Sequence, residues 1–252
     1  MTTAVDLLPR PRVAAAPAPE AAQDAFHAEQ YRVLGHIVEQ LAAGGRKVVA
    51  ITSAVGGDGK TTVSVELARS LAQRPDARVL LIDADLRRGS VARQLGLDGA
   101  VGPGLSGALE SKTPPLDAVV ACPPPSNLSL LPAGDTPQAP YELLRSPGVG
   151  ALLAAARERY DCVLVDTPPV VPVADVHALS QWVDGVILVV TAHQTPRELV
   201  SEALSAMDPE KLVGLVFNGD DEPLSRRYRS YYGYADEAPG SGWLAPLRRL
   251  LR

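Results

Sequence analysis

Apolar residues fall into short continuous runs that alternate with segments in which they recur at helical spacing. Strands are predicted from six runs: VVAIT (48–52), RVLLID (78–83), LSLL (128–131), CVLVD (162–166), WVDGVILVV (182–190) and LVGLVFN (212–218). Helices are predicted over residues 24–43, 60–73, 148–159 and 196–207. Continuous Val, Ile and Leu runs separated by helices are typical of parallel strands covered on both faces. The pattern therefore predicts an α/β fold, a parallel sheet with helices on both faces.

This alternation is confined to the middle of the chain. Residues 1–22 combine prolines with many alanines and offer little to bury, which predicts a flexible arm. Residues 23–221 are expected to form one domain, in which the Gly- and Pro-rich stretch 97–127 is the least regular insert. Residues 222–252 are expected to be a tail of different composition.

Charge and cysteine content narrow the classes of function. The formal net charge of −5 and the pI near 5.4 argue against non-specific nucleic-acid binding, which needs a basic face. Cys122 and Cys162 lack zinc-type spacing and fit a reducing compartment. No apolar run approaches the roughly 20 residues that span a bilayer, and the N-terminus lacks a signal-peptide pattern. A cytoplasmic location is expected.

The stretch SAVGGDGKTT (53–62) lies between a predicted strand and a predicted helix, as a phosphate-binding loop does. Glycines let backbone N–H groups converge on phosphate oxygens, and the helix N-terminus adds partial positive charge. Lys60 is expected to reach the β- and γ-phosphates of ATP, and Thr61 to bind Mg²⁺. The nucleotide-binding residues expected here are Gly56, Gly57, Asp58, Gly59, Lys60, Thr61 and Thr62. The alternative is a glycine-rich turn with a chance lysine, which the flanking strand and helix disfavour.

Three aspartates end two other predicted strands. Asp83 and Asp85 stand two residues apart in VLLIDAD, so an extended chain points both carboxylates to the same side. Asp166 ends CVLVD. Carboxylates at the carboxyl ends of parallel strands lie at the ligand crevice. There, one can hold Mg²⁺ and another can accept a proton from an attacking hydroxyl. The alternative for Asp83 or Asp85 is a turn cap.

Four of the seven tyrosines crowd into RRYRSYYGYAD (226–236); they are Tyr228, Tyr231, Tyr232 and Tyr234. Residues 225–234 contain no Val, Ile, Leu or Met, so these rings have no aliphatic neighbours with which to form a core strand. An edge hairpin or an interface patch is one interpretation. The other is a set of modifiable tyrosines in a flexible tail.

The last ten residues, WLAPLRRLLR (243–252), place apolar residues on one helical face with arginines beside it. This pattern fits docking onto the body of the domain, and it also fits contact with a membrane surface or a partner.

Together these motifs resemble the bacterial tyrosine kinases of the CpsD/CapB/Wzc type, which control capsule and exopolysaccharide synthesis. SAVGGDGKTT is similar to that family's Walker A motif, VLLIDADLRR to its Walker A′ motif and CVLVDTPPV to its Walker B motif. The stretch LLPAGDTPQAPYELLRSP and the tyrosine-rich end are similar to further segments of the family, the latter to its autophosphorylation cluster. The resemblance runs from about residue 29 to 234. It implies a P-loop NTPase-like fold related to MinD and ParA.

The resemblance also implies an ATP-dependent protein-tyrosine autokinase that phosphorylates its tail tyrosines. It assigns catalysis to Lys60, Asp83 and Asp85. The expected Mg²⁺ ligands are Thr61, Asp83 and Asp166. Asn218, which ends the last strand, is expected to contact adenine.

The segment EQYRVLG (29–35) resembles the family's Glu-x-x-Arg-x-x-Arg assembly motif. Glu29 and Arg32 match it, whereas Gly35 stands where the second arginine belongs, which leaves ring formation open. A homo-oligomer is expected. The alternative for Glu29 and Arg32 is an exposed pair within one helix.

The family further implies a membrane-embedded polysaccharide chain-length regulator as partner, recruiting the chain to the inner face of the membrane. A tyrosine phosphatase and other protein substrates are also expected partners, and nucleic acid is not. One alternative is an ATPase switch of the MinD/ParA kind, but those proteins carry a lysine where Val55 stands. Another is a weakly active, ATP-binding regulatory subunit.

Overall fold

The computed structural model describes residues 19–97, 102–111, 115–122, 127–171 and 175–219. Its strands are β1 (Val48–Ser53), β2 (Val79–Asp83), β3 (Val120–Ala121), β4 (Leu128–Leu131), β5 (Cys162–Asp166), β6 (Gly185–Thr191) and β7 (Leu212–Asn218). Its helices are α1 (Pro19–Ala43), α2 (Lys60–Leu71), α3 (Val91–Gln94), α4 (Gly104–Ser111), the 3₁₀ helix η1 (Pro115–Ala118), α5 (Pro140–Arg145), α6 (Pro147–Arg159), α7 (Asp175–Ser180) and α8 (Arg197–Ser205).

The described strands form one seven-stranded sheet in the order β3-β4-β2-β5-β1-β6-β7. Each neighbouring pair from β4 to β7 is parallel. The predicted parallel α/β sheet is therefore confirmed. Only β3 departs from it, because it runs antiparallel to β4 at one edge. With two residues, β3 is too short to produce a readable apolar pattern in the sequence.

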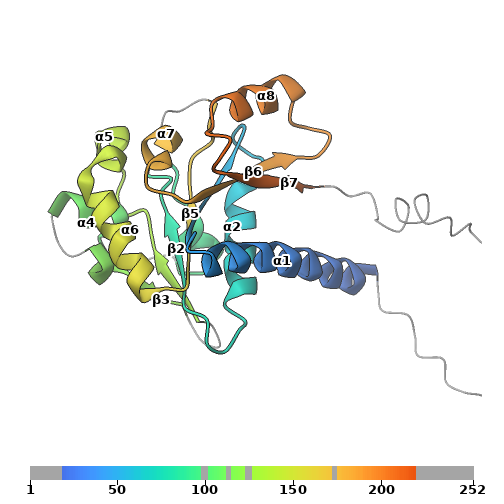
Figure 1. The fold of residues 1–252 in the computed structure, drawn as a ribbon, viewed down its shortest axis with the longest axis horizontal. Helices are drawn as coiled ribbons and strands as arrows, with labels where there is room; N and C mark the ends of the chain where they lie inside the picture. Colours follow the sequence, from blue (N-terminus) through green and yellow to red (C-terminus); the bar gives the residue numbers. More distant parts are fainter. Residues whose placement is uncertain (1–18, 98–101, 112–114, 123–126, 172–174, 220–252) are drawn as a thin grey trace, which may run out of the picture.

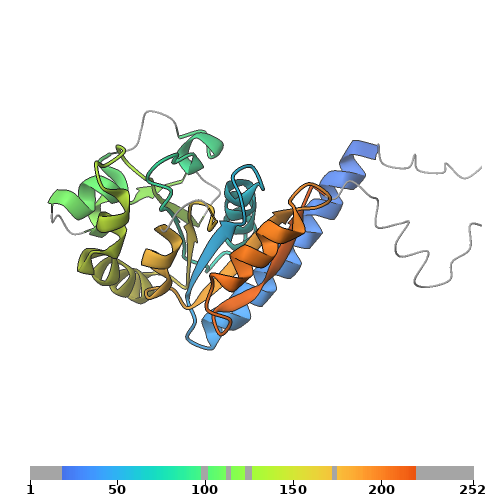
Figure 2. The ribbon, with the colours of Figure 1, turned by 90° about the horizontal axis from the view of Figure 1, so that it is seen from above.

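Helices cover both faces of the sheet, so alternate residues of one strand enter different cores. On one face, Val49 and Ile51 of β1 pack in a core with residues of α1, α2 and α3. On the other face, Val48 and Ala50 pack in a core with residues of α4, α5, α6 and α7. Figures 1 and 2 show the sheet between these two groups of helices. All six residues of β1 are buried, which explains why its sequence is continuously apolar until Thr52 and Ser53.

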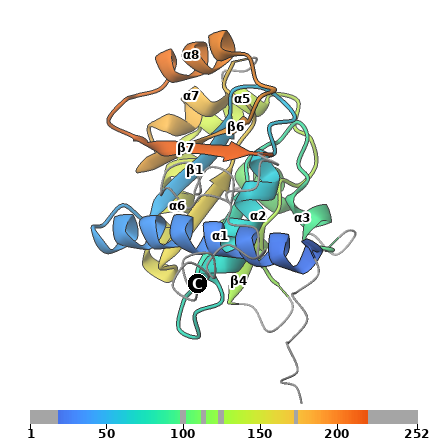
Figure 3. The same ribbon diagram turned by 90° about the vertical axis from the view of Figure 1, so that its right-hand side faces the viewer.

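The N-terminal helix α1 begins at Pro19, five residues before the predicted start at Asp24. Proline is tolerated in the first turn of a helix, and Glu, Ala and Gln follow it, whereas the apolar pattern used for the prediction starts only at Phe26. The helix lies across α2 (Figure 3). Val38 is fully buried there, while Val33 and Ile37 are 54% and 43% exposed.

The sequence pattern missed α3, α4, α5 and α7, which have four to eight residues each. Such helices are too short to reveal their period. The stretch 97–127, expected to be the least regular, contains α4, η1 and β3. The strand predicted from Trp182 begins at Gly185, because Trp182 N–H closes a turn on the Leu179 carbonyl. Across the described residues, no helix has both the length and the apolarity needed to cross a bilayer.

Candidate active site

The loop between β1 and α2 curls through two glycines with left-handed backbone. Gly57 has φ 98° and Gly59 has φ 83°, values that a residue with a Cβ adopts only at a cost. Gly59 is the N-cap of α2 and, lacking a side chain, makes no capping hydrogen bond. The first N–H groups of α2 and the positive end of its dipole therefore point into the loop. This geometry is that of an anion-binding cradle.

The strand order brings the predicted carboxylates to this loop. β5 lies between β1 and β2, and Asp166 pairs in register with Ile51 on one side and with Asp83 on the other. Asp85 follows β2 by two residues. The three aspartates therefore meet at the carboxyl edge of the sheet, next to the start of α2, as the sequence predicted.

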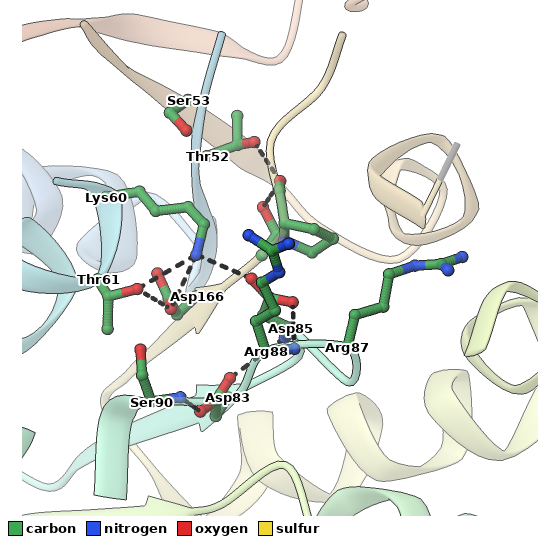
Figure 4. A network of polar contacts seen from close by, with 12 residues as sticks. Thr52, Ser53, Lys60, Thr61, Asp83, Asp85, Arg87, Arg88, Ser90 and Asp166 are labelled. Carbon is green, nitrogen blue, oxygen red and sulfur yellow. Dashed lines mark hydrogen bonds and ion pairs between the residues drawn. The ribbon is translucent and has the colours of Figure 1, made fainter. Parts of the chain in front are cut away.

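Lys60 reaches across from α2 to these carboxylates (Figure 4). Its Nζ lies 3.1 Å from Asp85 Oδ2 and 3.6 Å from Asp166 Oδ2. The side chains are 13% exposed for Lys60, 8% for Asp85 and 1% for Asp166. The cation and both carboxylates are thus largely removed from water.

Asp166 is held by two hydroxyl groups from α2. Thr61 Oγ1 donates to Asp166 Oδ2 at 2.8 Å, and Ser64 Oγ donates to Asp166 Oδ1 at 2.8 Å. The sequence interpretation missed Ser64. The sequence could have indicated this contact, because Ser64 stands one helical turn after Lys60 and so lies on the same face of α2.

Asp83 is tied to the turn that follows β2. Its Oδ2 accepts the N–H groups of Ser90 and Val91 at 2.9 and 3.1 Å, and its Oδ1 accepts the N–H of Asp85 at 3.2 Å. The turn-capping role that was the alternative for Asp83 is therefore present. Because Asp83 also lies beside Asp166 in register, capping and a place in the site coexist.

The buried groups have shifted pKa values. Burial alone would lower the pKa of Lys60, but the charges of Asp166 and Asp85 outweigh it, so this pKa is raised above 10.5. Burial raises the pKa of Asp166 above 3.8, even though Lys60 opposes the rise. Burial, with the charge of Asp166, raises the pKa of Asp83 to about 7. Negative charge is in excess here, which favours a further cation.

The residues fit Mg²⁺ bound together with a nucleotide. Among the described residues, no three acidic, His or Cys side chains converge into a ready-made metal cage. Mg²⁺ in nucleotide sites typically binds one or two carboxylates, phosphate oxygens and water. Thr61 and Asp166 supply oxygen ligands of this kind. On the loop, a Cβ added at Gly56 or Gly57 would meet no atom within 4 Å, so this side is open to phosphate.

Comparisons with known proteins agree with this geometry. Residues 46–208 match the model of a family described as an AAA domain. Tyrosine-protein kinase YwqD of Bacillus subtilis (strain 168) is 36% identical over 214 residues, which cover 84% of this chain and 88% of YwqD. The solved kinase domain of VpsO is 34% identical with a TM-score of 0.65, over 78% of this chain and 98% of that one. The chain belongs to the bacterial tyrosine-protein kinases.

Two further proteins resemble this chain, one in sequence and one in fold. The succinoglycan biosynthesis transport protein ExoP of Rhizobium meliloti (strain 1021) is 31% identical over 214 residues, which cover 82% of this chain but only 26% of ExoP. A ParA-family ATPase from Chlorobium tepidum TLS has a TM-score of 0.57 at 22% identity, over 75% of this chain and 81% of that one. The second likeness shows the shared fold alone, as predicted.

Two residues expected to bind the nucleotide also contact each other in this kinase fold. Asn218 Nδ2 donates to the backbone carbonyl of Asp58 at 3.0 Å. Asp58 is 3% exposed, and its side chain turns into the protein, away from the open side of the loop. Thr62, by contrast, is exposed on α2. The adenine contact of Asn218 stays a prediction.

An ion pair that the sequence did not predict joins the Walker A′ turn to α7. Arg87 donates to both carboxylate oxygens of Asp175, at 2.8 and 3.2 Å. Asp175 is 1% exposed and Arg87 is 43% exposed. Because the two residues stand 88 positions apart, nothing in the local sequence indicates the contact.

The assembly residues lie on α1 rather than at the site. Arg32 Nη1 donates to Glu29 Oε2 at 2.6 Å, and both side chains are more than half exposed, as in the alternative of an exposed intrahelical pair. Gly35 is buried, and a Cβ there would lie 3.5 Å from Leu71 of α2. The assembly role of Glu29 and Arg32 stays a prediction. The predicted phosphorylation sites, Tyr228, Tyr231, Tyr232 and Tyr234, lie outside the described residues.

Proposed function

We propose that this protein is an ATP-dependent protein-tyrosine kinase that phosphorylates its own tail. The observation that carries the proposal is the meeting of Lys60 with Asp85 and Asp166 beside the glycine loop. Phosphoryl transfer needs little covalent chemistry from a protein, but it does need a phosphate cradle, a lysine and metal-holding carboxylates. Membership of the tyrosine-kinase family supports tyrosine as the acceptor. The acceptors in this chain are Tyr228, Tyr231, Tyr232 and Tyr234.

The loop and the start of α2 bind the phosphates of ATP. Backbone N–H groups of residues 56–62 donate to phosphate oxygens, and the Lys60 ammonium neutralises charge that develops on the transferred group. Thr61 and Asp166 hold Mg²⁺, with Asp83 beside them. Bound Mg²⁺ supplies a further positive charge against the phosphates. In a site this dry, these charges act far more strongly than they would in water.

Asp85 is the carboxylate best placed to accept the proton of the acceptor hydroxyl. Both oxygens of Asp83 already accept backbone N–H groups, so few of its lone pairs are left to accept a proton. Asp85 Oδ1 accepts the N–H of Arg88, whereas its Oδ2 faces Lys60. Once Lys60 binds phosphate, Asp85 Oδ2 is released to take a proton. Asp83 then acts mainly by fixing the turn that carries Asp85.

The similarity to ExoP supports a role in exopolysaccharide or capsule synthesis and export. In this role the kinase works at the inner face of the cell membrane, with a membrane-embedded chain-length regulator as its activator. Self-association would deliver the tail of one copy to the site of another. A tyrosine phosphatase would reverse the modification, and other proteins would serve as further substrates.

The deciding experiment measures intact mass after incubation with ATP and Mg²⁺. We expect successive additions of one phosphoryl group, at most four, in the wild type. The variant with Tyr228, Tyr231, Tyr232 and Tyr234 all changed to Phe should add none. A matched control changes the other three tyrosines, Tyr31, Tyr141 and Tyr160, to Phe and should still be modified fully.

Other outcomes would point to the alternatives. Release of inorganic phosphate with no gain in mass would indicate an ATPase switch of the ParA kind. Binding of ATP without either product, even with a chain-length regulator's cytosolic tail present, would indicate a regulatory subunit.

A further inference from the structure

Asp58 is a buried carboxylate inside the phosphate loop. Its Oδ2 accepts the Val55 N–H at 3.2 Å, which closes the loop on itself. Its Oδ1 accepts the hydroxyls of Thr195 at 2.6 Å and Thr191 at 3.1 Å. A carboxylate taken out of water needs such donors, since an unsatisfied one is strongly destabilising. Three donors, one in its own loop and two in a single distant turn, therefore fix its position.

The two threonines belong to the turn that joins β6 to α8. Thr191 ends β6, and Thr195 stands just before α8. Thr195 Oγ1 also accepts the Thr191 N–H at 3.1 Å, and the Thr195 N–H donates to the Thr191 carbonyl at 3.1 Å. These contacts hold the turn in one shape, with both hydroxyls directed at Asp58. The anchor of the loop is thus itself well ordered.

A second anchor holds the same residue from the end of β7. Asn218 Nδ2 donates to the Asp58 carbonyl at 3.0 Å. Asn218 is itself fixed, because it pairs with Thr191 in the sheet and its carbonyl accepts the Ala192 N–H at 2.8 Å. A Cβ at Gly59 would lie 2.0 Å from Asn218 Nδ2, so glycine is required there for this close approach.

We propose that Asp58, Thr191, Thr195 and Asn218 form a loop clamp that shapes the phosphate cradle before the nucleotide arrives. The inference rests on the nucleotide-binding role proposed above, and it assigns these four as positioning residues. Asp58 stands two residues before Lys60 and next to Gly59, so fixing Asp58 fixes where the loop N–H groups and the start of α2 point. A pre-shaped loop spares the ordering cost that a flexible loop meets on binding.

The clamp acts on affinity rather than on the chemical step. Loop N–H groups contact phosphates both in the bound nucleotide and in the transition state, so loosening the loop weakens both equally. Such a change raises KM while kcat is retained. Lys60, by contrast, is expected to act on the transition state and therefore on kcat.

The test compares Thr195→Val with Thr195→Ser. Valine keeps the shape of threonine but removes the hydroxyl from Asp58, whereas serine keeps the hydroxyl. Thr195→Val should raise the dissociation constant of Mg-ADP and the KM for ATP by about ten-fold, the order expected for a lost hydrogen bond to a charged group. Its kcat for tail phosphorylation should stay within about two-fold of the wild type. Thr195→Ser should behave like the wild type.

A matched control and a nucleotide-free measurement complete the design. Ser205→Ala removes a hydroxyl of the neighbouring helix α8, one that donates to the Ser201 carbonyl on the exposed side, and should change neither constant. Without nucleotide, backbone amide hydrogen exchange in residues 55–59 should be about ten-fold faster in Thr195→Val, because the loop opens more often.

The clamp is wrong if Thr195→Val binds Mg-ADP as tightly as the wild type. It is equally wrong if the serine variant is as weak as the valine variant, or if kcat falls while KM is unchanged. If the loop exchanges faster in Thr195→Val but the wild type binds no Mg-ADP, both the proposed function and the binding role of the clamp fail. If the wild type binds Mg-ADP tightly and the variants bind it equally well, the clamp is wrong but the proposed function is not affected.

Discussion

The parallel strands begin at the amino edge of the sheet and end at its carboxyl edge. Both of these edges carry ion pairs, but in opposite surroundings. At the carboxyl edge, Lys60 pairs with Asp85 and with Asp166, and all three of these side chains are 13% exposed or less. At the amino edge, Arg78 pairs with Asp161 just before β2 and β5, with side chains 60% and 47% exposed. Both sites use the same chemistry. Their difference lies in how much water each charge has lost.

This difference indicates which pair serves function. An exposed pair contributes little, because water already solvates both charges and salt screens them. A buried group of charges is costly to desolvate, so its presence is better explained by what it does than by stability. Arg78 also anchors backbone, since its N–H donates to Asp161 at 2.9 Å, and its side-chain hydrogen bond lowers the pKa of Asp161. The amino edge thus fixes strand ends, while the carboxyl edge holds charge ready for a ligand.

The largest effect should come from removing the buried cation. Lys60→Met should lower the rate of tail phosphorylation at least about a thousand-fold, because the transferred group loses its positive partner in a dry site. The measurement is the initial rate of phosphate incorporation at saturating Mg-ATP. Arg78→Met, which removes a positive charge from the other edge, is the matched control and should keep the wild-type rate. A normal rate in Lys60→Met would refute the site.

Lys60→Met should also destabilise the fold. Asp85 and Asp166 then stay buried without their cation, which should cost about 3 kcal/mol in the free energy of unfolding at pH 8. The cost should shrink at pH 6, because protonation of Asp166, whose pKa is already raised by burial, relieves the repulsion. Urea unfolding at the two pH values measures this. A loss of stability that is the same at both would contradict the electrostatic explanation.

The pH dependence of the wild type follows from Asp83. Its pKa is about 7 in the folded protein against an ordinary 3.8, so between these values the folded state binds more protons than the unfolded state. Stability without nucleotide should therefore fall as pH rises through this window. From pH 5.5 to 8 the loss should be about 2 kcal/mol, given 1.4 kcal/mol per pKa unit.

Asp161→Asn provides the control for this slope. The pKa of Asp161 is lowered from 3.8, so its own contribution changes only below that pH and the slope above pH 5.5 should persist. Stability that rises with pH between 5.5 and 8 would contradict the environment described for Asp83.

The smallest effect is expected at the exposed pair. Arg78→Gln should leave the midpoint of thermal unfolding within the error of repeated measurements, because the lost attraction is weak in water. A clear drop would mean that the hydrogen bonds of Arg78 to Asp161 stabilise the strand ends more than exposure suggests.

The sequence by itself determined the architecture and most of the site. Strands buried on both faces must be continuously apolar, so β1, β2 and β5 could be read directly. A glycine loop between a strand and a helix and aspartates at strand ends placed Lys60, Asp83 and Asp166 at one edge. These signals are local, or they follow from the general geometry of parallel sheets.

Only the tertiary structure decided what the nearby polar residues do. Asp58 is predicted to contact the nucleotide, but no local signal indicates that its side chain faces Thr191 and Thr195, more than 130 positions away. Arg87 binds Asp175 across 88 positions, and Gly35, which stands where the family motif has its second arginine, lies buried against α2. The direction of a side chain depends on which distant segments pack beside it. Those segments come together only when strands far apart in the sequence pair in the folded sheet. The sequence therefore indicated which residues supply the chemistry, but it did not indicate which contacts position them.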